Sequence, residues 1–132
     1  MKIIQSFYQI DNKTSYNTNG DNTYLLNFYS LLLSYITIKK LYGSITMYCN
    51  EFAYNKMLKY IPYDNIVIDD VNLNNYRNEW GLLKFNVFEK QKEPFIHIDC
   101  DVFIFNDVFK SYFNDNSFDG IVQSIDINKK YP

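Results

Sequence analysis

The chain has 132 residues, enough for one domain with its own core, and its formal net charge is −2 at pH 7. Hydrophobic residues make up 47% and charged residues 21%, a globular composition and not a disordered one. This net charge does not indicate a strongly basic surface, on which nucleic-acid binding depends. We therefore treat residues 1–132 as a single domain and expect no nucleic-acid partner.

The cysteines and the apolar segments predict a cytoplasmic protein. Cys49 and Cys100 match neither a CxxC redox pair nor a zinc site, which favours a reducing compartment. The apolar run at the N-terminus is too short for a secretory signal. The most apolar stretch, residues 24–38, is broken by polar residues and falls short of the roughly 20 residues that span a bilayer. No integral membrane segment is expected, and Cys49 is interpreted as a buried apolar residue.

Apolar segments and turn residues predict strands and helices that alternate along the chain. Strands are expected at residues 2–8, 45–49, 65–69 and 95–99, and helices at residues 24–41, 51–60 and 80–91. Gly43 and Pro62 end the first two helices. A short extended piece at 102–105 and a last strand at 119–125 follow.

This alternation predicts an α/β fold with a mainly parallel sheet flanked by helices on both faces. The 95–99 strand is expected inside the sheet, because its apolar residues suit a strand covered on both sides. Ligands of such sheets bind at the carboxyl ends of the strands, at a topological switch point. The stretches after Phe7, Ile68 and Ile98 are therefore the candidate binding regions.

Asp99 and Asp101 follow an apolar strand directly and form a DxD motif. Residues i and i+2 of a strand point to the same side, and a turn here would still let both carboxylates converge on one ion. Mg²⁺ and Mn²⁺ prefer oxygen ligands, and they leave positions open for phosphate oxygens. The motif predicts a divalent-metal site, and the alternative is a pair of strand-end carboxylates that make turn hydrogen bonds.

The run EPFIHIDCDVFIF is similar to the DxD strand of an uncharacterised bacterial glycosyltransferase-like family, where it reads like PFIHIDGDVF. The upstream WGLLKFNVFEKQ resembles the same family's helix, and IIQSFY resembles its first strand. Glycogenin-like GT-A enzymes share the broader plan of a strand that ends in a DxD motif. The resemblance spans most of the chain and is strongest from residue 80 to residue 105. Cys100 departs from it, because the family usually has glycine there.

The resemblance implies a Rossmann-like GT-A fold, of which this chain covers the N-terminal, nucleotide-sugar-binding half, incomplete at its C-terminus. It implies a nucleotide-diphosphate sugar as donor, a UDP-sugar first of all, with Mn²⁺ or Mg²⁺ as cofactor. Asp101 would bind the metal, and Asp99 would bind the metal or the ribose. Lys84 would approach the phosphates or the DxD motif, and Gln5 and Ser6 would contact uracil or ribose.

Purely structural interpretations of the same residues stay open. Lys84 could be a solvated helix lysine, and Gln5 and Ser6 could make turn hydrogen bonds. His97, the only histidine, could contact a metal or substrate, but it alternates with apolar neighbours and is interpreted as a core residue with satisfied hydrogen bonds. Asp69 and Asp70 could contact the base or ribose, but they are interpreted as solvated loop residues.

The sequence is compatible with two different functions. A hexosyltransferase-like enzyme is expected to transfer the sugar to an acceptor that the sequence does not identify. The other reading is a catalytically inactive, truncated α/β fragment that acts as a nucleotide-binding or interaction module. An incompletely covered sheet would in either case expose apolar surface and promote self-association.

Overall fold

The computed structural model describes residues 2–9, 22–69, 71–72 and 80–109. These residues form a sheet of four strands: β1 (Lys2–Phe7), β2 (Ile45–Cys49), β3 (Asn65–Ile68) and β4 (Phe95–His97). The strand order is β3-β2-β1-β4, and every pair of neighbours is parallel. The register places Ile3 of β1 between Ile45 of β2 and Ile96 of β4.

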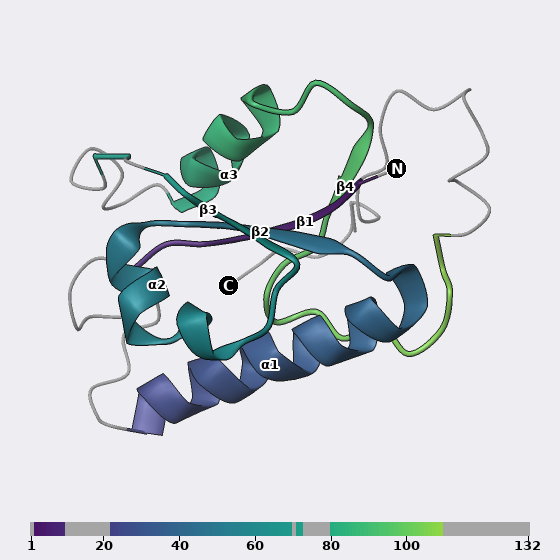
Figure 1. Ribbon diagram of the computed structural model, residues 1–132, viewed down its shortest axis with the longest axis horizontal. Helices are drawn as coiled ribbons and strands as arrows, with labels where there is room; N and C mark the ends of the chain where they lie inside the picture. Colours follow the sequence, from purple (N-terminus) through teal and green to yellow (C-terminus); the bar gives the residue numbers. More distant parts are fainter. Residues whose placement is uncertain (1, 10–21, 70, 73–79, 110–132) are drawn as a thin grey trace, which may run out of the picture.

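Helices cover both faces of this sheet. The helical elements are α1 (Asn22–Tyr42), α2 (Glu51–Lys56), a short 3-10 turn η1 (Leu58–Tyr60) and α3 (Trp80–Glu89). Figure 1 shows α1 and α2 on one side of the sheet and α3 on the other. The predicted α/β fold with a parallel sheet between helices is therefore confirmed.

The pleat of β1 divides its side chains between two cores. Ile3 and Phe7 pack with residues of α1 and α2, in the larger apolar cluster. Ile4 and Tyr8 pack with Leu83 and Val87 of α3, in the smaller one. Because successive side chains of a strand point to opposite faces, the intervening polar residues of β1 are divided between the faces as well.

Local signals in the sequence explain where two of the helices begin and end. α1 ends at Tyr42 because Gly43 adopts a φ of 82°, a left-handed conformation in which its N–H reaches the carbonyl oxygen of Lys39 at 3.0 Å. α2 begins after Asn50, whose side chain accepts a hydrogen bond from the Ala53 N–H. The same Asn50 side chain donates to the Gln9 carbonyl oxygen at 2.8 Å, which fixes the end of β2 beside the end of β1.

Three expected elements differ in the structure. The second helix does not run on to residue 60, because Met57 leaves the helical dihedral range at φ −145° and buries its side chain in the core. The fourth strand ends at His97, and it pairs with β1 alone at one edge of the sheet that the described strands form. Residues 102–105 form no regular element. The predicted strand at 119–125 lies outside the described residues.

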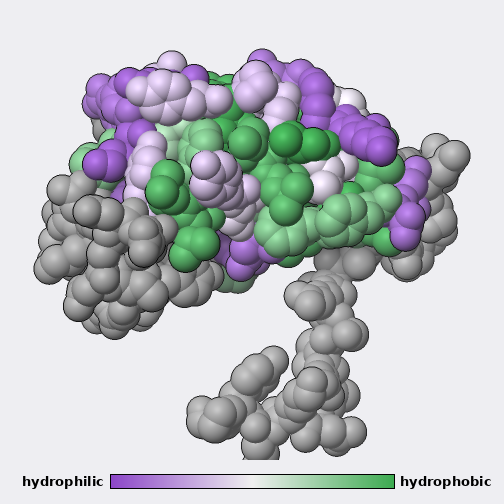
Figure 2. All heavy atoms as spheres, turned by 90° about the horizontal axis from the view of Figure 1, so that it is seen from below, coloured by the Kyte–Doolittle hydropathy of each residue, from purple (hydrophilic) through white to green (hydrophobic). Residues whose placement is uncertain are grey.

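Helix α1 buries one face and exposes the other. Leu31 and Ile38 are almost completely buried against the sheet, whereas Leu26 is 69% exposed and Ile36 is 50% exposed. Figure 2, which views the molecule from the α1 side, shows apolar residues gathered on this surface. Among the described residues, no helix is long and apolar enough to cross a membrane.

Candidate functional site

The strand order creates a topological switch point between β1 and β4. From β1 the chain adds β2 and β3 on one side, and then returns to place β4 on the other side. A pocket of about 320 Å³ opens beside the carboxyl ends of β1 and β4. Its walls come from residues 6–8 after β1, residues 99–101 after β4, and parts of α1 and α3. This is the position where open parallel sheets bind their ligands.

A tight turn carries both carboxylates of the DxD motif to the pocket. The Ile98 N–H still pairs with the Ile4 carbonyl oxygen at 3.0 Å, and the chain then turns so that the Val102 N–H reaches the Asp99 carbonyl oxygen at 3.0 Å. Asp99 and Asp101 both line the pocket. The two carboxylates are therefore held on one turn and not on a continuous strand, and each remains accessible to solvent.

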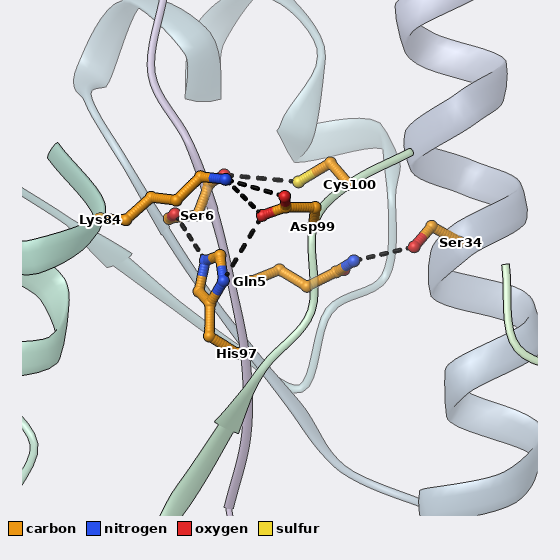
Figure 3. A network of polar contacts seen from close by, with 7 residues as sticks. All are labelled: Gln5, Ser6, Ser34, Lys84, His97, Asp99 and Cys100. Atoms are coloured by element: carbon orange, nitrogen blue, oxygen red, sulfur yellow. Dashed lines mark hydrogen bonds and ion pairs between the residues drawn. The ribbon is translucent and has the colours of Figure 1, made fainter. Parts of the chain in front are cut away.

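Lys84 of α3 forms an ion pair with both oxygens of Asp99. Its ammonium nitrogen lies 2.6 Å from Oδ1 and 2.8 Å from Oδ2. Figure 3 shows the Lys84 side chain reaching the Asp99 carboxylate. The two side chains keep 40% and 44% of their surface exposed, so the pair sits at the pocket wall and not in the core. Asp101 forms no ion pair with any residue that the structure describes.

His97 lies beneath this ion pair, between Ser6 and Asp99 (Figure 3). Its Nε2 is 2.9 Å from the Ser6 hydroxyl, and its Nδ1 is 3.5 Å from Asp99 Oδ1. Burial lowers the pKa of His97 most, Asp99 raises it and Lys84 lowers it, and together these effects bring it to about 4. The ring is therefore neutral at pH 7. A proton on Nδ1 suits the carboxylate, which only accepts, and leaves Nε2 to accept from Ser6.

Cys100 occupies the centre of the turn. Its thiol donates to the Ser6 carbonyl oxygen at 3.4 Å, which ties the turn to the end of β1. Burial raises the pKa of this thiol, and the neighbouring carboxylates raise it further. The thiol therefore keeps its proton at neutral pH, and Cys100 packs between the two carboxylates of the turn. Cys49 is fully buried, as expected, and both cysteines are free.

Gln5 does not line the pocket, although the sequence placed it with Ser6. Its amide nitrogen donates to the Ser34 hydroxyl at 2.8 Å, and its amide oxygen accepts from the Tyr63 hydroxyl at 3.1 Å. The side chain is 0% exposed. The alternation of β1 explains this correction, because adjacent residues of a strand must point to opposite faces. Ser6 faces α3 and the pocket, and Gln5 therefore faces α1.

Asp69, at the end of β3, belongs to a different cluster. Its carboxylate accepts from the Tyr8 hydroxyl at 3.1 Å and pairs with Lys90, and only 11% of its side chain is exposed. Burial and the nearby Asp69 charge raise the pKa of Tyr8. The interpretation of Asp69 as a solvated loop residue was wrong, because Tyr8 and Lys90 cover it. Asp70 lies outside the described residues.

The whole chain, residues 1–132, matches the model of a single protein family, described as "Family of unknown function (DUF6734)". The chain belongs to this family. No curated protein and no solved structure matches it.

The donor set of the DUF6734 pocket suits a hard divalent cation that also has ligands from its substrate. Asp99 and Asp101 supply carboxylate oxygens, and Mg²⁺ in particular is commonly bound by one or two carboxylates together with phosphate oxygens and water. Within the described part of the chain, no group of three or more His, Cys, Asp or Glu residues could hold a metal ion.

Sequence reasoning missed two parts of this site. His97 is a largely buried residue with satisfied hydrogen bonds, as interpreted from the sequence, but its contacts with Ser6 and Asp99 were not anticipated. Its position two residues before Asp99 was the available signal, because residues i and i+2 of a strand share a face. Asn27 and Ser30 of α1 also line the pocket. No signal in the sequence could have identified them, because α1 approaches the site only through the packing of the whole sheet.

Proposed function

We propose that this chain is a GT-A-like, nucleotide-sugar-binding domain of a glycosyltransferase, and that its donor is a UDP-sugar. The observation that carries the proposal is the position of Asp99 and Asp101, which both line the pocket at the switch point between β1 and β4. The pocket volume of about 320 Å³ lies within the range of small-molecule sites. The resemblance of residues 80–105 to a glycosyltransferase-like family supports the same assignment.

The residues of the pocket divide the work of binding a diphosphate. Asp99 and Asp101 hold Mn²⁺ or Mg²⁺, and such a cation neutralises charge that develops on a diphosphate leaving group. Lys84 supplies the second positive charge at the same wall. The Ser6 hydroxyl, which lines the pocket beside His97, is the group in β1 that is placed to contact ribose or base.

The experiment is a calorimetric titration of UDP into the protein, with and without Mn²⁺. Wild type is expected to bind UDP only in the presence of the metal. Asp101→Ala is expected to lose that binding, because Asp101 has no ion pair among the described residues and its carboxylate is therefore available to the metal. Glu93→Ala is the matched control, since it removes an exposed carboxylate from outside the pocket. Equal binding without metal, or an Asp101→Ala variant that binds like wild type, contradicts the proposal.

A second candidate function is nucleotide binding without sugar transfer. It is favoured by the small number of reactive groups, since Asp99 and Asp101 are the carboxylates among the described residues that line the pocket. His97, the nearest base, is engaged by Ser6 and Asp99. An assay that measures the release of free UDP from UDP-sugars distinguishes the two functions. Metal-dependent UDP binding with no release of UDP from any UDP-sugar supports the second.

A further inference from the structure

The ammonium of Lys84 occupies the side of Asp99 that a divalent cation would need. It contacts both carboxylate oxygens, at 2.6 and 2.8 Å. We propose that Lys84 is an exchangeable occupant of the metal site, which holds Asp99 while the pocket is empty and moves to the diphosphate when nucleotide and cation bind together. This inference rests on the proposed function and specifies how that site is regulated.

Competition follows from the geometry of the carboxylate. A metal ion bound by Asp99 shares the two carboxylate oxygens that the Lys84 ammonium now contacts at 2.6 and 2.8 Å. An ammonium and a divalent cation beside the same carboxylate also repel each other strongly at such short range. Lys84 and a cation therefore compete for Asp99, and binding of the cation alone has to weaken or displace the contact with the lysine.

Lys84 is placed to leave without disturbing the fold. Its side chain is 40% exposed at the pocket wall, and ion pairs with that exposure contribute little to stability. Four rotatable carbons carry the ammonium from a fixed position on α3. His97, by contrast, is held by Ser6 and is only 9% exposed, so it stays in place as the support of Asp99 when the lysine swings away.

A diphosphate changes the balance in favour of the cation. It offers the displaced ammonium a new anionic partner at the same wall of the pocket, and it offers the cation additional oxygen ligands. Nucleotide and metal therefore bind cooperatively, and the cation alone binds weakly. Removing Lys84 should then have opposite effects on the two ligands, because it frees Asp99 for the metal and deprives the diphosphate of a contact.

The test measures two affinities in Lys84→Met. Binding of Mn²⁺ alone is followed by the electron paramagnetic resonance signal of the free ion, and binding of UDP at saturating Mn²⁺ is followed by calorimetry. We expect Lys84→Met to bind Mn²⁺ alone about 5-fold or more tightly than wild type, and to bind UDP about 5-fold or more weakly. Lys84→Arg keeps the charge and should bind Mn²⁺ as weakly as wild type.

Lys90→Met is the matched control, because Lys90 pairs with Asp69 just beyond the same helix and does not line the pocket. It should leave both affinities unchanged. Near-ultraviolet circular dichroism verifies that each variant is folded. If Lys84→Met binds Mn²⁺ no more tightly than wild type, the exchange is wrong, and metal-dependent UDP binding by wild type would leave the proposed function standing. If wild type binds Mn²⁺ neither alone nor with UDP, both are wrong.

Discussion

The amide of Gln5 and the hydroxyl of Ser34 meet at 2.8 Å where β1 faces α1. Both residues are fully buried, and the Ser34 hydroxyl also donates to the Val102 carbonyl oxygen at 2.7 Å. One hydroxyl therefore connects the first strand, the first helix and the segment that follows the DxD turn. This contact places Gln5 in the framework behind the site, on the opposite face of β1 from the pocket.

Ser34→Ala should destabilise the fold without weakening ligand binding. The substitution leaves the Gln5 N–H and the Val102 carbonyl oxygen without their partner, which costs about 1–3 kcal/mol for a buried polar group. Urea unfolding measures the loss, and Ser44→Ala, at an exposed position, is the control. A loss of UDP affinity in folded Ser34→Ala, with unchanged stability, would indicate that Gln5 belongs to the binding site.

Asp64 should make stability depend on pH in the acid range. Its carboxylate pairs with Lys39 and accepts from the Ile45 N–H at 2.9 Å, and these contacts lower the pKa of Asp64. A carboxyl group with a depressed pKa stabilises the fold at pH values above its ordinary, unfolded-state pKa. This contribution is lost as the pH falls through the folded-state pKa. Asp64→Asn should therefore be less stable than wild type by up to about 1 kcal/mol near pH 7, and equally stable near pH 2. Urea unfolding at both pH values measures this, and a constant difference would show that the charge is not responsible.

The exposed face of α1 should make the protein self-associate. Leu26, Tyr29, Leu33 and Ile36 are 43–69% exposed along one side of the helix, and apolar surface of this kind promotes association between copies. Leu26→Lys should weaken the association seen by sedimentation velocity and change stability by less than about 0.5 kcal/mol. Asn55→Lys adds the same charge on α2 and should have no effect. A wild type that stays monomeric at every concentration would contradict this prediction.

The sequence was most informative where a local pattern decides the structure. The second strand begins and ends at Ile45 and Cys49 as expected, because Gly43 fixes the end of the preceding helix and Asn50 caps the next one. Leu83 and Val87 share a buried helix face, as their spacing indicates. Lys84 then faces the pocket from the same helix.

The sequence was least informative where tertiary packing decides. α1 is apolar around most of its circumference, so periodicity alone did not reveal that Leu25 is 48% exposed while Leu31 is buried. Strand alternation separates Gln5 from Ser6, but it does not say which of the two faces the pocket. That choice depends on the position of α3 and of the turn after β4, which only the complete sheet defines.

The central claim is that Asp99 and Asp101 bind one divalent cation together with a nucleotide diphosphate. A crystal structure of the protein with UDP and Mn²⁺ tests it most directly, because the anomalous signal of manganese locates the ion independently of the protein. We expect a single peak about 2.1 Å from a carboxylate oxygen of each residue, with diphosphate oxygens completing the coordination and Lys84 moved from Asp99 to the phosphates. Nucleotide bound in the pocket with no manganese at these carboxylates, or manganese bound elsewhere, would contradict it.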